Sequence, residues 1–188
     1  MALQTNAVKL MELTDVKVAR LLTDSSSAPT YDSLVDLSGA LKLTISPKSE
    51  MKKLYGDSEL KDVYSRVTEI EVDGECTVLS LDALKIMLGG AVTASGTTPN
   101  QKQTFALTSA TATLPFFKLE GKWTYAGEGL GDAHVVLYKC KVSDAPAVEI
   151  NDASGSFGTI KFKAIALPAA ANGAWYDLVL NETAAAIA

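Results

Sequence analysis

The sequence predicts a mainly β fold: an antiparallel β-sandwich or rolled barrel with one short flanking α-helix at about residues 80–88 and long loop arms. Apolar and polar residues alternate with period two over much of the chain, which is typical of strands with one buried face. Helical periodicity is confined to a single segment. The 188 residues fit one domain, with arms at the N-terminus, at residues 47–62 and at the C-terminus.

The alternating segments predict the strands in chain order. They cover residues 15–22, 41–45, 65–72, 117–125, 134–142, 159–167 and 175–180. Lys161 and Lys163 flank Phe162 and are expected on the opposite face of their strand. The Asp-Gly-Glu sequence at residues 73–75 predicts a tight turn, which would end one strand and lead into a short apolar run at residues 76–79.

One segment has the pattern of a helix. Ser80 is a good N-cap, and Leu81, Leu84 and Leu88 fall on one stripe. Gly89 supplies the expected stop. A helix of two to three turns is marginal by itself, so we expect it to pack on the sheet.

The connections are long. They are rich in Gly, Ser, Thr, Pro or charged residues and cover residues 24–29, 47–62, 91–103, 126–132 and 151–158. Long loops in a compact domain are commonly functional or interfacial.

Composition excludes several classes of protein. Hydrophobic residues make up 47% and charged residues 21% of the chain, which is too apolar for a wholly disordered protein. No run approaches the roughly 18 apolar residues of a membrane helix, and the N-terminus lacks the pattern of a secretory signal. The net charge of −5 does not fit a protein that binds duplex nucleic acid through a basic surface.

The sequence offers no catalytic, cofactor-binding or metal-binding residues. Cys76 and Cys140 lie far apart in apolar runs without a CxxC spacing, which predicts two buried, reduced thiols and a reducing compartment. The glycines at 127, 129 and 131 precede a strand instead of a helix, so they predict a hairpin turn and not a dinucleotide site. His134, the only histidine, starts an apolar strand and is expected to be structural or on the surface.

An acidic ladder, Glu69, Glu71 and Asp73, is spaced by two along one predicted strand. Carboxylates on one face repel one another and must contact water. Two interpretations stay open: an ordinary solvated outer face, or a surface that must not hold nucleic acid.

The arm at residues 47–62 mixes apolar anchors with charges of both signs. Its apolar residues include Met51, Leu54 and Tyr55, and residues 60, 63 and 64 (Leu, Val and Tyr) continue the pattern. Such a mixture favours an intersubunit contact over a mobile surface loop. The candidate contact residues are Lys48, Glu50, Met51, Lys53, Leu54, Tyr55 and Asp57. The same two interpretations, an intersubunit contact or a mobile surface segment, apply to residues 24–40 and to the C-terminal tail.

Three stretches resemble the bacteriophage major tail protein, the tail tube subunit of long-tailed phages. They are residues 37–47 with 53–57, residues 69–72 with 81–89, and residues 118–123 with 135–142. Val136 stands where that family would have an aromatic residue. The resemblance spans about residues 12–180, and the family has no catalytic residues to carry over.

The resemblance implies a structural virion protein that self-assembles into rings, usually of six subunits, which stack into the tail tube. The tube would form in the host cytoplasm and then belong to the virion tail, of the non-contractile type. Partners would be further copies of the chain and the tape-measure, initiator and terminator proteins, with no membrane. Phage DNA would pass through the lumen without specific binding. Glu69, Glu71 and Asp73 are the candidate lumen face, and the 47–62 loop is the candidate ring-stacking contact.

Other functions stay open at this point. A related injection tube, similar to that of type VI secretion, or a tail-terminator component would share the fold. A carbohydrate- or receptor-binding β-sandwich would need a platform of exposed aromatic residues. Trp123 and Tyr125 fall on a predicted core face, and the adjacent Trp175 and Tyr176 must point in opposite directions, so such a platform has weak support. An enzyme has the least support.

Overall fold

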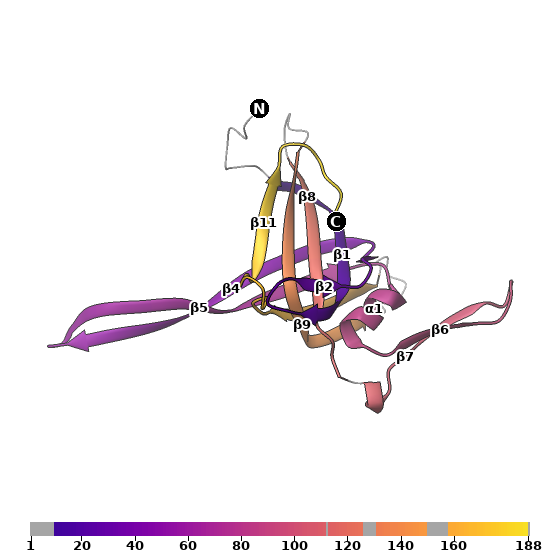
Figure 1. The fold of residues 1–188 in the computed structure, drawn as a ribbon, viewed down its shortest axis with the longest axis horizontal. Coiled ribbons are helices and arrows are strands. Elements are labelled where there is room, and N and C mark those ends of the chain that lie inside the picture. The colour runs from indigo at the N-terminus through magenta and orange to yellow at the C-terminus, as the bar shows by residue number, and fades with distance from the viewer. Residues whose placement is uncertain (1–9, 112, 126–130, 150–157, 188) are drawn as a thin grey trace.

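The computed structural model describes residues 10–111, 113–125, 131–149 and 158–187. These residues are mainly antiparallel β-structure with a single short α-helix (Figure 1). The elements are β1 (Leu10–Asp24), β2 (Pro29–Tyr31), β3 (Val35–Asp36), β4 (Ala40–Gly56), β5 (Glu59–Cys76), α1 (Leu81–Leu88), β6 (Ala91–Ser95), β7 (Lys102–Ala106), a 3₁₀ turn (Ser109–Thr111), β8 (Phe117–Tyr125), β9 (Asp132–Glu149), β10 (Thr159–Ala166) and β11 (Tyr176–Asn181).

Nine strands form one curved sheet. Its path runs β2-β1-β8-β9-β10-β5-β4, with β11 added to β9 and β3 to β1. The two remaining described strands, β6 and β7, pair only with each other. The mainly antiparallel β prediction is confirmed, but the described strands do not close into a barrel.

The core lies between the sheet and α1. Phe117, Leu119, Val135 and Leu137 from β8 and β9 are completely buried, and α1 contributes Met87. The predicted core face of β8 is therefore confirmed for Phe117 and Leu119, but Glu120 on the opposite face is also buried, at 4% exposed. The exposure of Lys161 and Lys163 on either side of buried Phe162 shows the expected alternation in β10.

The predicted helix is confirmed with its caps. The Ser80 hydroxyl accepts a hydrogen bond from the Ala83 amide at 3.2 Å. Gly89 adopts φ 81° and donates its amide to the Lys85 carbonyl at 3.0 Å. Leu84 and Leu88 are buried as their stripe predicted, since the helix has this sheet to cover.

The prediction of loops at residues 47–62 and 91–103 is wrong. The first segment is a long hairpin in which β4 and β5 pair as far as Gly56 and Glu59, and the second is the β6–β7 hairpin. Asp57 and Ser58 form the tight turn between β4 and β5, both with positive φ. Neither hairpin tip buries a face against the body, so the period-two hydrophobic signal of a half-buried strand is absent there.

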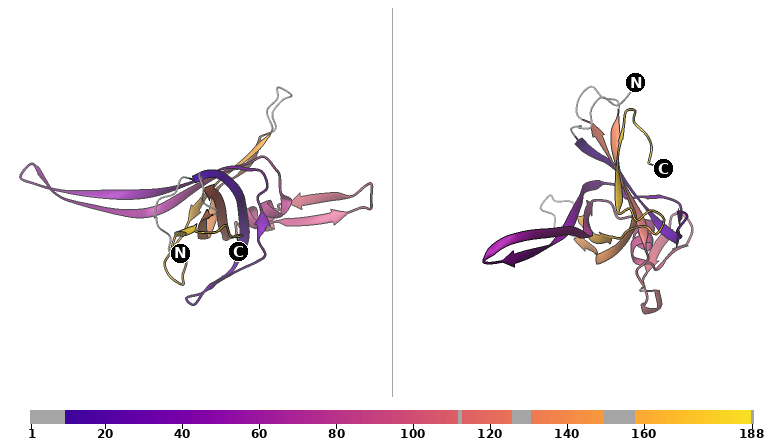
Figure 2. Two further views of the ribbon diagram at one scale, coloured as in Figure 1. Left: turned by 90° about the horizontal axis from the view of Figure 1, so that it is seen from above. Right: turned by 60° about the vertical axis from the view of Figure 1, so that its left-hand side comes forward.

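The two hairpins leave the body in opposite directions. The β4–β5 hairpin projects to the left in Figure 1 and the β6–β7 hairpin to the right, and Figure 2 shows the same separation from above. The expected arm at residues 24–40 instead folds back, because β2 and β3 pair with β1.

The predicted turn at residues 73–75 is also wrong, because β5 continues to Cys76. Gly74 lies opposite Phe162 of β10. A Cβ at Gly74 would stand 2.2 Å from the Phe162 Cζ. The glycine therefore makes room for an aromatic ring and does not turn the chain.

Candidate assembly interface

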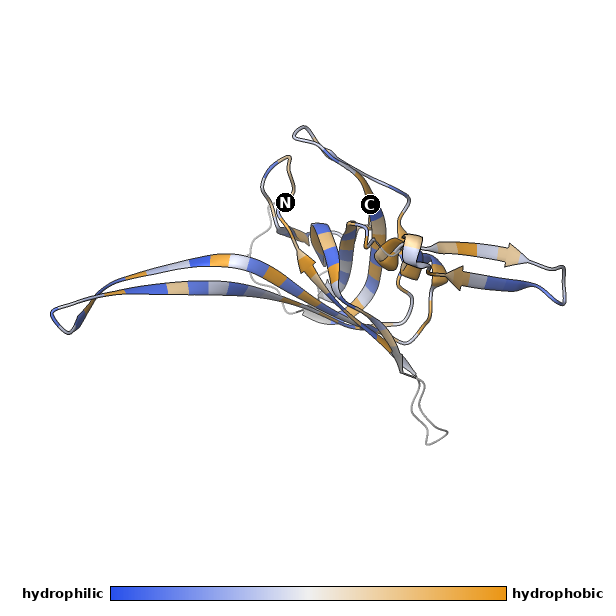
Figure 3. Ribbon diagram, turned by 90° about the horizontal axis from the view of Figure 1, so that it is seen from below, coloured by the Kyte–Doolittle hydropathy of each residue, from blue (hydrophilic) through white to orange (hydrophobic). Residues whose placement is uncertain are grey.

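The part of β4 and β5 beyond the body, residues 47–68, is called the long hairpin below. Apart from the half-buried Gly56, every residue in it is exposed. Its large exposed apolar side chains are Met51, Leu54, Tyr55, Leu60, Val63, Tyr64 and Val67. Figure 3 shows apolar and polar residues interspersed along both strands.

The strand register sorts these side chains onto two faces. Met51 lies opposite Ser65, Lys53 opposite Val63, and Tyr55 opposite Leu60, and opposed residues share a face. The apolar face carries Met51, Tyr55, Leu60, Val63 and Val67. The polar face carries Glu50, Lys52, Asp62 and Arg66, with Leu54 and Tyr64 among them. The long hairpin is thus amphipathic although neither face is covered.

All seven candidate contact residues of this arm lie on the long hairpin, but they do not form one surface. Met51, Lys53 and Tyr55 share the apolar face, whereas Glu50 and Leu54 lie on the polar one. Lys48 lies near the body and Asp57 in the turn. Val67 belongs to the apolar face and was not among the candidates. Val67 joins this face through the pairing of β5 with β4, and that pairing could not be predicted from the sequence of the 47–62 arm alone.

The acidic ladder does share one outward face of β5, because Ile70 and Val72 between its members are buried. The structure adds lysines that sequence spacing did not reveal. Lys48 lies 2.9 Å from the Glu71 carboxylate, and this hydrogen bond raises the Lys48 pKa. Lys163, which is opposite Asp73, lies 3.7 Å from that carboxylate. The ladder is therefore part of a mixed-charge surface.

An open hollow of about 490 Å³ continues this surface over β4, β5, β9 and β10. Its charged lining residues are Lys42, Lys161, Lys163, Asp73, Glu75 and Asp144. Since the two signs are equal in number, the hollow has no bias toward an anion or a cation.

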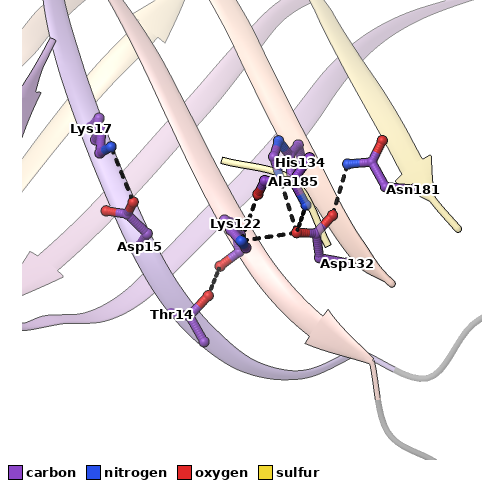
Figure 4. A network of polar contacts seen from close by, with 8 residues as sticks. All are labelled: Thr14, Asp15, Lys17, Lys122, Asp132, His134, Asn181 and Ala185. Carbon is purple, nitrogen blue, oxygen red and sulfur yellow. Dashed lines mark hydrogen bonds and ion pairs between the residues drawn. The ribbon is translucent and has the colours of Figure 1, made fainter. Parts of the chain in front are cut away.

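A second polar cluster lies under the C-terminal segment, residues 182–187 (Figure 4). Its centre is Asp132, which is 0% exposed. Asn181 Nδ2 donates to Asp132 Oδ1 at 2.7 Å, the Ala185 amide donates to Oδ2 at 2.9 Å, and Lys122 Nζ lies 2.9 Å from Oδ2. Burial alone would raise the Asp132 pKa, but these hydrogen bonds outweigh it and hold the pKa well below its ordinary value.

His134 is buried beside Asp132, so it is a structural residue. Its Nε2 lies 3.3 Å from Asp132 Oδ2 without the alignment of a hydrogen bond. The C-terminal segment passes over this cluster and binds it through Ala185. The Asp132 carboxylate and the Lys122 ammonium therefore hold a piece of the chain in the present conformation.

The structure also gives the positions of the predicted thiols and aromatic residues. Cys76 and Cys140 are free and buried, as predicted. Trp123, Trp175 and Tyr176 pack against the core, which argues against a platform for sugar stacking. The turn at residues 126–130 lies outside the described residues.

Within the described ranges, no group of three or more His, Cys, Asp or Glu residues could hold a metal ion. No helix of that same part of the chain is long and apolar enough to cross a membrane. Neither the family models nor the curated proteins compared with this sequence contain a match. The functional argument therefore depends on the fold and its surfaces.

Proposed function

We propose that this chain is a structural subunit that assembles with copies of itself into stacked rings, the tail tube of a bacteriophage through which the genome reaches the host. The observation that carries the proposal is the uncovered apolar face of the long hairpin. Residues 48–56 span roughly 30 Å at the usual rise of a strand, which is far enough to lie on a neighbouring subunit. The resemblance stated above supplies the identity of the tube and its tape-measure, initiator and terminator partners.

The size of the apolar face fits a repeated contact. Its five large side chains are between 43% exposed, at Val63, and 63% exposed, at Tyr55. Full burial of one such side chain is worth about 1.5–3 kcal/mol, so covering the exposed half of all five contributes roughly 5 kcal/mol. Association costs consume much of this gain. Such a contact is weak alone and becomes stable when a ring repeats it.

The sheet edges support the same proposal. Among the described strands, β4 pairs only with β5, and β2 only with β1. Exposed strand edges are prone to pair with other chains. If β4 of one copy meets the opposite edge of the next, the contact is heterologous, and it gives a ring when the rotation between copies divides a full turn.

The outward face of β5 with Glu69, Glu71 and Asp73 is our proposed lumen face. Its lysine partners balance the carboxylates, so a DNA phosphate would have to separate an ion pair before a lysine could hold it. Replacing Glu69 and Glu71 with Lys should leave tubes intact and slow DNA passage. Normal infectivity of that variant would refute the lumen assignment.

The test of assembly compares the two faces of the long hairpin by negative-stain electron microscopy and light scattering. Tyr55→Lys with Val63→Lys places charges on the apolar face and should abolish tubes. The matched control, Leu54→Lys with Tyr64→Lys, places the same charges on the polar face and should still give tubes. Tubes from both variants would contradict the apolar contact. A wild-type chain that stays monomeric even with its initiator and tape-measure proteins would contradict the function.

A further inference from the structure

Outside the long hairpin, the described chain has further large apolar side chains that are substantially exposed. They are Leu22, Leu41, Val78, Leu79, Leu107, Leu178 and Val179. Leu178 and Val179 are consecutive on β11, so they point to opposite faces of that strand. Leu22 and Leu107 come from separate parts of the chain. The other three come from one corner of the body.

This corner is where β4 begins and β5 ends. Ala40, the first residue of β4, pairs with Cys76, the last residue of β5. Leu41 follows the one, and residues 78–79 come shortly after the other. Leu41, Val78 and Leu79 are called the base patch below, and they are 58%, 46% and 49% exposed.

The backbone of the base patch is held in shape by its own chain. The Gly39 carbonyl accepts hydrogen bonds from the Thr77 amide at 2.9 Å and from the Thr77 hydroxyl at 3.2 Å. Gly39 has φ 70°, and a Cβ there would stand 2.9 Å from Val78 Cγ2, so the close approach of the two segments requires glycine. A surface that is already ordered loses less entropy when a partner binds.

The base patch is also free of charge. Residues 37–41 and 76–81, the two segments that form it, contain no Asp, Glu, Lys or Arg. Contact of apolar side chains with water is unfavourable, and a group of them on an uncharged surface marks an interaction site. The apolar face of the long hairpin has side chains of the same kind and similar exposure.

The base patch and the tip of the long hairpin lie at opposite ends of the same two strands. β4 and β5 pair from Ala40 and Cys76 to Gly56 and Glu59, which is roughly 50 Å along the strands at the usual rise. In Figure 1 the tip is at the left, and α1, which follows the base patch, is on the other side of the body. The long hairpin therefore cannot cover the base patch of its own chain, whereas a second copy placed head to tail can do so.

One charge beside each surface supports the same match. Lys53 lies on the apolar face of the long hairpin, opposite Val63. Asp82 is exposed in the first turn of α1, three residues after Leu79. Neither Lys53 nor Asp82 has an ion-pair partner among the described residues. A lysine on one surface and a carboxylate on the other attract one another across a contact and set its orientation.

We propose that the base patch is the acceptor for the apolar face of the long hairpin from a second copy of this chain, with Lys53 of one copy beside Asp82 of the next. The inference rests on the proposed function, because it names the partner surface of the contact proposed there. Each copy offers one donor and one acceptor at opposite ends, so the contact can repeat from copy to copy along the tube.

A charged acceptor tests the proposal without any change to the long hairpin. In Val78→Lys with Leu79→Lys both substituted side chains are exposed, so the urea midpoint of the monomer should not change. The protein concentration needed for tubes, followed by light scattering, should rise at least about tenfold, because the contact would bury unpaired charges. The matched control, Leu22→Lys with Leu107→Lys, charges exposed apolar residues outside both surfaces and should form tubes at the wild-type concentration.

Cysteine cross-linking identifies the two surfaces directly. A Val63→Cys chain is mixed with a Val78→Cys chain at high concentration, treated with a short bismaleimide and analysed by mass spectrometry. Dimers that join position 63 of one chain to position 78 of the other should form. The matched control Tyr64→Cys, on the polar face, should not join to position 78, and the native Cys76 and Cys140 are buried from the reagent.

The outcomes separate this contact from the function on which it rests. Tubes at the wild-type concentration from the Val78→Lys, Leu79→Lys chain would overturn the acceptor and leave the proposed function standing. Equal cross-linking of positions 63 and 64 to position 78, or no cross-linking of either, would also overturn the acceptor. A chain that cross-links as expected but never forms tubes would keep the contact and count against the proposed function.

Discussion

Strand β5 has two halves that both pair with β4 but have opposite surroundings. Residues 69–76 alternate between the core and the outward face, and Val72 is 0% exposed. Residues 59–68 are exposed throughout, and Val67 is 46% exposed. Strand pairing alone therefore does not bury a side chain, because burial requires a second layer. The described residues supply no such layer to the outer half, so under the proposed assembly that layer would come from another chain.

The largest expected difference comes from one substitution made in both halves. Val72→Asp would bury a charge without a partner and should cost more than about 4 kcal/mol, enough to unfold many domains. Val67→Asp places the same charge in water and should change the stability of the monomer by less than about 0.5 kcal/mol. Urea denaturation followed by circular dichroism measures both.

The same pair separates folding from assembly. Val67→Asp should give folded monomers that do not form tubes, because the charge lies on the apolar face of the long hairpin. If Val67→Asp unfolds the protein, the outer half is stabilised by its own chain and the comparison fails. If it leaves tubes of ordinary length, the apolar face is not the contact.

A second comparison is between a carboxylate that the chain itself buries, Asp132, and a partly exposed carboxylate, Glu69. Asp132→Asn keeps the shape but leaves Lys122 without its counter-ion, so we expect a loss of about 3 kcal/mol. A neutral control on the exposed ladder, Glu69→Gln, should cost nothing measurable. An Asp132→Asn protein as stable as wild type would show that the cluster does not hold the C-terminal segment firmly.

The pH dependence of this effect has a definite sign. The folded-state pKa of Asp132 lies below the ordinary value of 3.8. Its contribution to stability is therefore complete above the unfolded-state pKa and is lost as the pH falls toward the folded-state pKa. Between pH 5 and 7, about one pH unit or more above the ordinary pKa of 3.8, the contribution of Asp132 to stability should not change with pH. Below pH 4, the loss of stability should be smaller in Asp132→Asn than in wild type.

Gly74 tests how closely the covered half of β5 is packed. Gly74→Ala brings a methyl group against the Phe162 ring, where the ideal Cβ would lie 2.2 Å from Cζ, and should cost roughly 2 kcal/mol. Combining it with Phe162→Leu should recover part of that loss, which a double-mutant cycle in urea would measure. Strict additivity of the two losses would mean that the ring and the added methyl do not meet.

Sequence reasoning succeeded where a residue has a local role. Ser80 and Gly89 set the helix ends by hydrogen bonds within a few residues, and the alternation in β10 follows from one buried face. It failed where the cause lies on a distant strand. At residues 73–75, where a turn was expected, β5 continues and Gly74 makes room for the ring of Phe162, 88 positions later in the chain.

The candidate site shows the same limit. The contact residues of the 47–62 arm were found by composition, but their division between two faces depends on pairing with the returning strand. The acidic ladder was placed on one face correctly, whereas its lysine neighbours come from β4 and β10. The Asp132 cluster was missed, because its members Lys122, Asn181 and Ala185 carry no motif and meet only when β8, β9 and the C-terminal segment pack together.

The smallest expected effect is at the boundary between the two halves, where Lys48 contacts Glu71. Both side chains are substantially exposed, so solvent and side-chain entropy offset their attraction. The Lys48 pKa is raised from 10.5, first by its hydrogen bond with Glu71, so any stabilisation is present at neutral pH and lost only in strong alkali. Lys48→Met should leave the urea midpoint at pH 7 unchanged within error, and the matched variant Glu71→Gln should do the same. A clear shift in either midpoint would mean that the Lys48–Glu71 ion pair stabilises the base of the long hairpin. The stability of the outer half of β5 would then depend on contacts with the body more than the exposure of its residues indicates.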